Sequence, residues 1–313
     1  MPVTAVKAAK AGVRRAVVIG ASGFIGYNLS TLLTGLRIDT ACFTRETRFL
    51  QRDGLDCLLR TADFIFYLAS SINPTLAEQH PEWAQADHAL FAELVSRLAR
   101  TGRPPTVVLA SSGTVYDPDV SPPYSELSPT RATEGYGAAK LALEQELVRH
   151  SAAVPGVILR ISTVYGPGQR AASGQGVLAH WRKAAREGRP LRVIGNPGST
   201  RDYIYIDDVI DCMYRIFLAE GQELFSEWGN PLVLNVASGV PTSLAALADT
   251  VREVVDPGLA FEYVPARPFD RVHIWADIER ARHALGWQPR MRIPEGIRAM
   301  WACEPRPDPG KRV

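Results

Sequence analysis

The chain has 313 residues, of which 46% are hydrophobic and 22% charged, and its formal net charge is +2. This composition is typical of a globular protein that is long enough to bury a sizeable core, and the small charge argues against a nucleic-acid or membrane-surface partner. No apolar stretch approaches the roughly 18 residues of a membrane span, and the basic start of the chain lacks the apolar centre of a signal peptide. We therefore expect a cytoplasmic protein.

The histidines and cysteines give no sign of a metal site. The six histidines do not cluster, and Cys42, Cys57, Cys212 and Cys303 have neither CxxC nor His-partnered spacing. We expect no bound metal and no disulfide framework, with the cysteines as buried free thiols in a reducing compartment.

Apolar runs with the pattern of buried parallel strands recur in the first half of the chain, at 16–20, 63–70, 106–112 and 156–163. A helical pattern over 82–100 lies between the second and the third of them. Its apolar stripe comprises Trp83, Ala86, Leu90, Leu94, Val95 and Leu98. Strands that alternate with helices predict a parallel sheet covered by helices on both faces.

Beyond about residue 165 the sequence changes to Gly- and Pro-rich loops between shorter elements. Two helices are expected there, at 207–219 and 243–255, the second N-capped by Thr242 or Ser243. The fold class is therefore α/β, a Rossmann-type doubly wound parallel sheet with a smaller, interleaved C-terminal substrate-binding domain. The boundaries that we expect are a dinucleotide-binding domain over 14–165 with returning segments at about 203–220 and 232–240, a mainly substrate-binding domain over 166–303, and flexible tails at 1–13 and 304–313.

A glycine-rich turn follows the first strand. Gly20, Gly23 and Gly26 form the pattern GxxGxxG and open an apolar helix. Glycine is needed where the backbone turns sharply, where a pyrophosphate approaches the main chain and where helix meets strand, and the helix N-terminus offers N–H groups to the phosphates. The turn predicts a dinucleotide site with the candidate ligands Gly20, Ser22, Gly23, Phe24, Ile25 and Gly26.

The end of the next strand departs from the usual dinucleotide pattern. An acidic residue normally binds the adenosine ribose there, whereas this chain has Thr44 and Arg45, with Arg48 three residues on. Loss of the acid removes the repulsion that it would exert on a 2′-phosphate, so the arginine permits NADP(H) as an alternative to NAD. Only about 18 residues separate Arg45 from Asp63, which leaves room for one short helix and at most a stub of strand.

Four polar residues form the candidate catalytic group. Tyr136 and Lys140 lie one turn apart in a helical stretch, and Ser112 and Thr114 end a strand at the edge where open α/β sheets bind ligands. Removal of a hydride from a carbinol carbon requires a base for the hydroxyl proton. A phenol has a reference pKa of about 10, and a nearby cation lowers the pKa of an acid by roughly 1–3. We expect Lys140 to bring the pKa of Tyr136 partway to neutrality, and the positive charge of an oxidised nicotinamide to contribute the rest.

Together these motifs resemble the extended short-chain dehydrogenase/reductase family, and especially its nucleotide-sugar epimerases of the UDP-glucose 4-epimerase type. The resemblance runs from Ala16 to Trp301 and is carried by the segments YLAS (67–70), SSGTVY (111–116), YGAAK (136–140), RISTVYGPGQ (160–169), RDYIYIDDV (201–209), NVASG (235–239) and ADIERARHALGWQP (276–289). It implies that Tyr136 is the acid/base and that Lys140 holds the ribose and tunes Tyr136. It also implies that Ser112 and Thr114 orient the 4-hydroxyl of the sugar.

The resemblance implies further ligands of the cofactor and of a nucleotide-diphosphate sugar. For the cofactor it adds Thr44, Arg45, Leu68, Ala69, Ser70, Ser111, Tyr136 and Lys140 to the glycine turn. For the substrate it implies Thr163, Gln175, Val193, Arg201 and Arg267. The two arginines match positions that bind the diphosphate, whose oxygens a guanidinium grips at two points. Thr163 stands where the family has Asn, and a hydroxyl cannot supply both the donors and the carbonyl of an amide.

Three functions are compatible with these residues. We favour a C4 epimerase, which oxidises C4, lets the 4-keto sugar rotate and returns the hydride to its other face with a retained NAD. The alternatives are an NADP(H)-dependent reductase of nucleotide 4-keto sugars and, more remotely, a non-catalytic NADP(H)-binding redox sensor. The dehydratases and decarboxylases of the family carry an acidic residue just after the strand-end Ser/Thr, and this chain has Val115 and Tyr116 there. By the same resemblance we expect a homodimer that pairs through helices at 82–100 and 135–150.

Overall fold

The computed structural model describes residues 14–52, 54–132, 135–171, 176–219, 221–265 and 271–303. Its main feature is a six-stranded parallel sheet in the order β11–β7–β6–β5–β1–β2. The strands are β1 (Arg15–Ile19), β2 (Asp39–Phe43), β5 (Phe64–Tyr67), β6 (Thr106–Ser112), β7 (Gly156–Ile161) and β11 (Leu232–Val236). Every residue of β5 and β7 is buried, as a parallel sheet with two covered faces requires.

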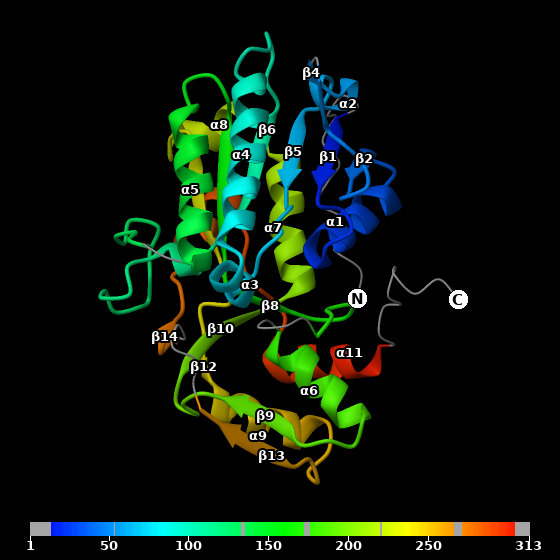
Figure 1. Cartoon of the computed structure of the whole chain (residues 1–313), viewed down its shortest axis with the longest axis vertical. Helices are drawn as coiled ribbons and strands as arrows, with labels where there is room; N and C mark the ends of the chain where they lie inside the picture. Colours follow the sequence, from blue (N-terminus) through cyan, green and yellow to red (C-terminus); the bar gives the residue numbers. More distant parts are fainter. Residues whose placement is uncertain are drawn as a thin grey trace.

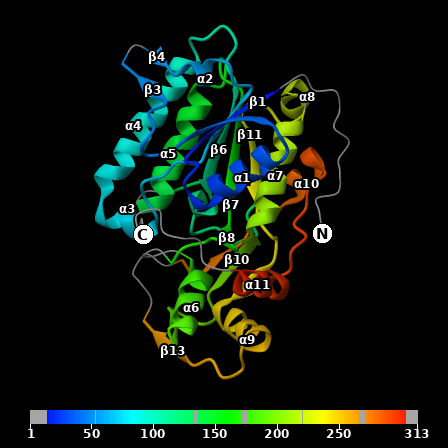
Figure 2. The same cartoon turned by 90° about the vertical axis from the view of Figure 1, so that its right-hand side faces the viewer.

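Helices cover both faces of this sheet (Figure 2). One face carries α1 (Phe24–Gly35) and α7 (Ile206–Leu218), and the other carries α4 (Pro81–Leu98) and α5 (Gly135–Arg149). Successive strand residues point to opposite faces, so Ala16 and Val18 belong to the first core while Val17 and Ile19 belong to the second. The prediction of a doubly wound α/β sheet of the Rossmann type is confirmed.

The prediction of one buried apolar stripe on the helix at 82–100 is wrong for its N-terminal part. The buried residues of α4 are Phe91, Leu94, Val95 and Leu98. Trp83 and Leu90 are each 39% exposed, and Ala86 is exposed as well. The ring of Trp83 stacks on that of His80, with 4.1 Å between the ring centroids. The helix therefore carries a second apolar stripe, which does not face the sheet.

The passage between β2 and β5 is as short as the sequence requires. It contains β3 (Leu50–Gln51), β4 (Gly54–Leu55) and α2 (Cys57–Arg60). Where at most one stub of strand was expected, the two short strands pair with each other in antiparallel fashion and stay outside the main sheet. The sheet therefore ends at β2.

The strands of the main sheet point with their carboxyl ends towards a smaller, loop-rich part of the molecule (Figure 1). Its strands are β8 (Thr163–Tyr165), β9 (Leu191–Ile194), β10 (Thr200–Tyr205), β12 (Pro241–Ser243), β13 (Phe261–Val264) and β14 (His273–Ile274). β10 pairs with β8, β12 and β14, and β9 pairs with β13. The remaining helices are α3 (Pro74–Gln79), α6 (Val177–Arg186), α8 (Gly221–Ser226), α9 (Leu244–Val254), α10 (Glu279–Leu285) and α11 (Ile293–Ala302). Ser243 caps α9 by accepting the N–H of Ala246 at 3.1 Å, which confirms one of the two expected caps.

The four cysteines are free thiols, but only Cys212 is buried. Cys42, Cys57 and Cys303 are exposed, so the expectation of buried thiols is wrong for three of the four. Cys42 lies on β2, an edge strand whose residues are mostly accessible to solvent. Within the described ranges, no helix is long and apolar enough to cross a membrane, and no three His, Cys, Asp or Glu side chains are grouped as metal ligands.

Candidate active site

The glycine turn between β1 and α1 packs backbone against backbone. Gly20 has φ +91°, and a Cβ at this position would lie 2.6 Å from the backbone nitrogen of Ala69, in the loop after β5. A Cβ on Gly26 would clash with the carbonyl oxygen of Gly20. The N–H groups of Gly20 and Ala21 donate to the carbonyl of Phe43 at 2.9 and 3.1 Å. The turn is thereby joined to the ends of β2 and β5, and the close approaches at Gly20 and Gly26 leave no room for a Cβ.

The N-terminus of α1 fits a pyrophosphate. Its N-cap residue, Gly23, has no side chain that could accept a hydrogen bond, and its first turn contains no acidic residue. The N–H groups of this turn and the positive end of the helix dipole are therefore available to a phosphate. Ser22 is exposed beside them, while Phe24 and Ile25 are half-buried against the core. The residues present thus suit a dinucleotide.

The end of β2 forms a tight turn that presents two cations. The Oγ1 of Thr47 accepts the N–H of Thr44 at 2.7 Å, and the Oγ1 of Thr44 accepts the N–H of Glu46 at 3.3 Å. Arg45 and Arg48 are exposed and form no hydrogen bond or ion pair with any residue that the structure describes. The residues at the end of β2 therefore include two exposed arginines, with Glu46 between them, where the usual dinucleotide pattern has an acidic residue.

The loop after β5 carries the cofactor candidates Leu68, Ala69 and Ser70, all half-buried. The N–H of Leu68 donates to the carbonyl of Ile19 at 2.8 Å, and the hydroxyl of Ser70 donates to the carbonyl of Ile72 at 3.1 Å. The first bond ties the loop to the end of β1, next to the glycine turn, and the second stabilises the loop itself.

Ser112 and Thr114 form one polar group at the end of β6. Ser112 ends the strand, and Thr114 lies in the 3₁₀ turn η1 (Gly113–Val115). The Oγ of Ser112 accepts two hydrogen bonds from Thr114, one from its N–H at 3.2 Å and one from its hydroxyl group at 3.1 Å. Helix α5 approaches this turn because residue 137 is glycine: a Cβ there would lie 2.7 Å from the carbonyl oxygen of Thr114. The start of α5, which carries Tyr136, therefore packs against the turn.

Tyr136 and Lys140 face each other on α5. The Nζ of Lys140 lies 5.5 Å from the centre of the Tyr136 ring and donates to the carbonyl of Ala110 at 3.2 Å. Burial lowers the pKa of Lys140 to about 8, although the negative charge of Asp87 opposes this. The ammonium group is therefore close to its ionisation point near neutral pH.

The pKa of Tyr136 contradicts the expectation from the sequence. Burial, followed by the negative charge of Asp87, raises it to about 12. Removal of the phenol from water thus outweighs the cation one turn away. The lowering that general-base catalysis needs requires further positive charge in the site, which is the role expected above for an oxidised nicotinamide.

Asp87 of α4 is a residue of this site that the sequence analysis missed. Its Oδ2 accepts the N–H of Ser71 at 2.7 Å, and it lines a small pocket together with Ser70 and Lys140. A signal was present in the sequence. Asp87 lies one helical turn before Phe91 and so extends the buried stripe of α4 with a charge.

Ser111, a cofactor candidate, is bound to a buried ion pair. Its hydroxyl donates to Glu144, whose Oε2 also accepts Nη2 of Arg160 at 2.8 Å. All three residues are buried. The hydroxyl group of Ser111 therefore donates its proton to a hydrogen bond inside the protein.

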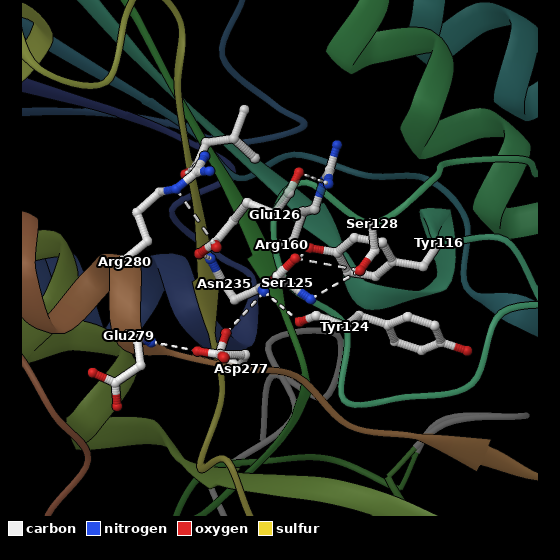
Figure 3. Close-up of polar contacts among 11 residues, drawn as sticks. Tyr116, Tyr124, Ser125, Glu126, Ser128, Arg160, Asn235, Asp277, Glu279 and Arg280 are labelled. Carbon is white, nitrogen blue, oxygen red and sulfur yellow. Dashed lines mark hydrogen bonds and ion pairs between the residues drawn. The ribbon is translucent and has the colours of Figure 1, made fainter.

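A second hydrogen-bond network holds the segment after the Ser112–Thr114 turn (Figure 3). The hydroxyl of Tyr116 donates to Oδ1 of Asn235 at 2.5 Å, and the amide group of Asn235 donates to the carbonyls of Tyr124 and Asp277, each at 2.9 Å. The carboxylate of Glu126 accepts the backbone N–H of Asn235 at 2.8 Å. The segment 116–126 is thereby tied to β11 and to the chain after β14.

Arg201 is held by backbone carbonyls at the start of β10. Its Nη1 donates to Thr200 at 2.9 Å and to Val272 at 3.2 Å, and its Nη2 donates to Arg271 at 2.6 Å. Thr163 is the first residue of β8 and pairs with Tyr203 of β10, the strand that also contains Arg201. The guanidinium group is therefore positioned by the main chain.

Of the remaining substrate candidates, the structure describes only Val193. Val193 is fully buried within β9, so its side chain belongs to the core and not to the surface of a site. Gln175 and Arg267 lie outside the described residues.

Comparisons with known proteins identify the family of the chain. The family model of the NAD dependent epimerase/dehydratase family matches residues 16–226. A UDP-glucose 4-epimerase of Mycolicibacterium smegmatis is 30% identical over 311 residues, which cover 90% of this chain and 96% of that protein. A dTDP-4-dehydro-6-deoxyglucose reductase of Escherichia coli is 30% identical over 194 residues, 61% of this chain and 58% of that protein. A UDP-glucuronic acid 4-epimerase of Bacillus cereus, solved with UDP-glucuronic acid and NAD, shares the fold, with a TM-score of 0.78 and 22% identity over 92% of this chain and 98% of that one.

The chain therefore belongs to the NAD dependent epimerase/dehydratase family, within the extended short-chain dehydrogenases/reductases that its motifs indicate, and it is an enzyme. Its relatives include epimerases, reductases and, at 25% identity, UDP-glucuronic acid decarboxylases of Arabidopsis thaliana. Family membership defines nucleotide-sugar chemistry but does not select one reaction.

Proposed function

We propose that this enzyme is a nucleotide-sugar C4 epimerase in which Tyr136 moves the proton of the sugar's 4-hydroxyl. The observation that carries the proposal is the meeting of three features at one edge of the sheet: the glycine turn, the Ser112–Thr114 hydroxyls and the Tyr136–Lys140 pair. The similarity to the mycobacterial UDP-glucose 4-epimerase, which extends over nearly the whole chain, supports it.

The cofactor proposed is NAD, which supplies a centre that takes up a hydride and returns it. Gly20, Gly23 and Gly26 allow its pyrophosphate to approach the N-terminus of α1. The ammonium group of Lys140 binds its ribose hydroxyls and adds positive charge beside Tyr136.

The proton steps belong to the protein. The hydroxyls of Ser112 and Thr114 hydrogen-bond to the oxygen at C4 and orient it towards Tyr136. The phenolate of Tyr136 accepts the hydroxyl proton as C4 is oxidised, and the phenol gives it back to the same oxygen once the 4-keto sugar has turned its other face. The carbonyl oxygen needs a proton donor in the second half of the reaction, and the high pKa of Tyr136 suits this part.

The substrate proposed is a nucleoside-diphosphate sugar. Arg201 is already fixed by three backbone carbonyls, so it can bind a diphosphate with little loss of side-chain freedom. Thr163 offers one hydroxyl on the neighbouring strand, where the family amide would offer more bonds.

An NADP(H)-dependent 4-keto-sugar reductase is the second candidate, and Arg45 and Arg48 favour it. Two exposed guanidinium groups without a carboxylate partner among the described residues suit a 2′-phosphate better than a bare ribose. The reductase of Escherichia coli noted above is a relative with this type of reaction.

We also propose that the enzyme is a homodimer. Helices α4 and α5 lie side by side (Figure 1), and their outer surface exposes Trp83, Leu90 and Val148. Pairing of two such surfaces would remove these side chains from water.

The experiment that separates the two reactions is identification of the released dinucleotide. The purified protein is denatured, and its small molecules are analysed by mass spectrometry. Bound NAD(H) in near-stoichiometric amount supports the epimerase. A protein that carries no NAD(H) and consumes NADPH steadily with a nucleotide 4-keto sugar is the reductase, and the absence of turnover with any sugar nucleotide would leave only the redox sensor.

A further inference from the structure

Arg271 lies just before β14 and reaches back to the segment that follows the Ser112–Thr114 turn. Its Nη1 donates to the carbonyl of Tyr116 at 3.0 Å and to that of Thr114 at 3.4 Å. Its Nη2 donates to the hydroxyl of Tyr124 at 2.9 Å. One guanidinium group therefore ties three points between residues 114 and 124 to the chain before β14.

The carbonyl of Thr114 is contacted from two sides. On one side, the space that a Cβ of residue 137 would occupy lies 2.7 Å from this oxygen, so α5 touches it through Gly137. On the other side it accepts the bond from Arg271. The turn that carries the Ser112 and Thr114 hydroxyls is thus held between the start of α5, next to Tyr136, and the side chain of Arg271.

The backbone of Arg271 holds a different residue. Its carbonyl accepts Nη2 of Arg201 at 2.6 Å, and the next carbonyl, that of Val272, accepts Nη1 of Arg201 at 3.2 Å. Pairing of β10 with β14 fixes the two chains alongside each other, with Thr200 opposite His273. Arg271 therefore contacts both Arg201, through its main chain, and the Ser112–Thr114 turn, through its side chain.

We propose that Arg271 is a positioning residue that couples diphosphate binding at Arg201 to the placement of the Ser112 and Thr114 hydroxyls beside Tyr136. The inference rests on the function proposed above and concerns a position that none of the family motifs includes. A guanidinium group is suited to the task, because its rigid fork fixes two or more carbonyls in one plane, whereas an ammonium group holds them less firmly. Displacement of reacting groups by about 1 Å costs on the order of 10² in rate.

The kinetic test uses Arg271→Met, which keeps the apolar stem and removes the donors, and Arg271→Lys, which keeps the charge. We expect Arg271→Met to lower kcat for a UDP-sugar by roughly 10- to 100-fold with KM changed less than about 3-fold, since the diphosphate contact at Arg201 survives. Arg271→Lys should recover part of kcat. Arg131→Met is the matched control: it removes an exposed arginine that is bonded to Asp117 in the same segment, and kcat should stay within about 2-fold.

A second measurement does not depend on turnover. Hydrogen–deuterium exchange is followed with and without UDP, at residues 112–116 and 200–205. In the wild type UDP should protect both segments, and in Arg271→Met it should protect 200–205 only. Protection of both segments in Arg271→Met, or in Arg271→Lys should the methionine variant not fold, together with wild-type kcat, would overturn the coupling and leave the proposed function intact. A wild-type protein in which UDP protects neither segment would overturn both.

Discussion

Asp87 of α4 and Lys140 of α5 line the same small pocket, although they are 53 positions apart in the sequence. The carboxylate of Asp87 is fixed there by the N–H of Ser71 at 2.7 Å. Its negative charge raises the pKa of Tyr136 and opposes the lowering of the pKa of Lys140 by burial. Tyr136 and Lys140 are therefore coupled to a third ionisable side chain, and the charge of Asp87 raises the pKa of both, in addition to the larger effect of burial.

Replacement of Asp87 by Asn should move the whole pH profile to lower pH. Loss of the negative charge stabilises the phenolate of Tyr136 and also destabilises the ammonium group of Lys140, so both pKa values fall. We expect both limbs of the bell-shaped profile of kcat/KM to shift in the acidic direction by roughly one pH unit. The limb near pH 8, which reports the buried lysine with its pKa of about 8, is the easier one to follow.

The control for this prediction is Glu93→Gln on the same helix. Glu93 is exposed and paired with Arg97, so its charge is screened by water and should leave both limbs in place. If the limbs stay fixed in Asp87→Asn, or move apart, the effect of Asp87 on the pKa values of Tyr136 and Lys140 is contradicted.

Replacement of Tyr136 by Phe should abolish turnover while the dinucleotide remains bound. A positioned acid/base contributes about 10²–10⁴-fold, so we expect kcat to fall by about 10³-fold or more. Steady-state kinetics and the absorbance of bound cofactor measure the two properties separately. Tyr263→Phe, at a 54% exposed tyrosine of β13, should behave as the wild type. Turnover at the wild-type rate in Tyr136→Phe would refute its role.

The sheet and the residues near one another in sequence could be predicted, because they depend on local patterns. Unbroken apolar runs indicate parallel strands, and the spacing of Tyr136 and Lys140 places them on one face of a helix. The pKa of Tyr136 could not be predicted in this way. It depends on burial and on Asp87, which reaches the site from a different helix.

Replacement of Gly137 by Ala should damage both stability and catalysis. The new Cβ would lie 2.7 Å from the carbonyl oxygen of Thr114, a backbone atom that cannot move without shifting the Ser112–Thr114 turn. Overpacking of this kind costs about 1–3 kcal/mol, which urea unfolding measures, and kcat should fall by roughly 10-fold or more.

Gly35→Ala is the matched control. Gly35 ends α1 in open space, so alanine there should be neutral or stabilise by up to about 1 kcal/mol without changing kcat. Equal effects of the two alanines would show that the close approach of α5 to the turn has no catalytic consequence.

Replacement of Leu90 by Glu should convert a dimer into monomers. Leu90 is 39% exposed on the outer side of α4, and a buried carboxylate in the paired surface would be costly. Light scattering after size exclusion gives the mass, and Leu127→Glu, at an 84% exposed leucine, is the control. A wild-type protein that is already monomeric, or a dimer that survives in Leu90→Glu, would contradict pairing through α4 and α5.

The same helix shows where periodicity is ambiguous. Trp83 and Leu90 repeat with helical spacing, as do Phe91 and Leu98, and the pattern alone does not say which stripe faces the sheet. Likewise, Val193 matches a family position but is fully buried, because alternation along β9 turns it into the core. In both cases the neighbours that decide the outcome come from distant parts of the chain.

The central claim is tested most directly by nuclear magnetic resonance of a UDP-sugar incubated with the purified protein in D₂O, with no dinucleotide added. An epimerase with a retained cofactor should form the 4-epimer until equilibrium is reached, and the product should carry no deuterium at C4, because the same hydride returns to that carbon. Failure to form the 4-epimer from any member of a broad panel of UDP-sugars, or deuterium at C4 of the product, would contradict the account.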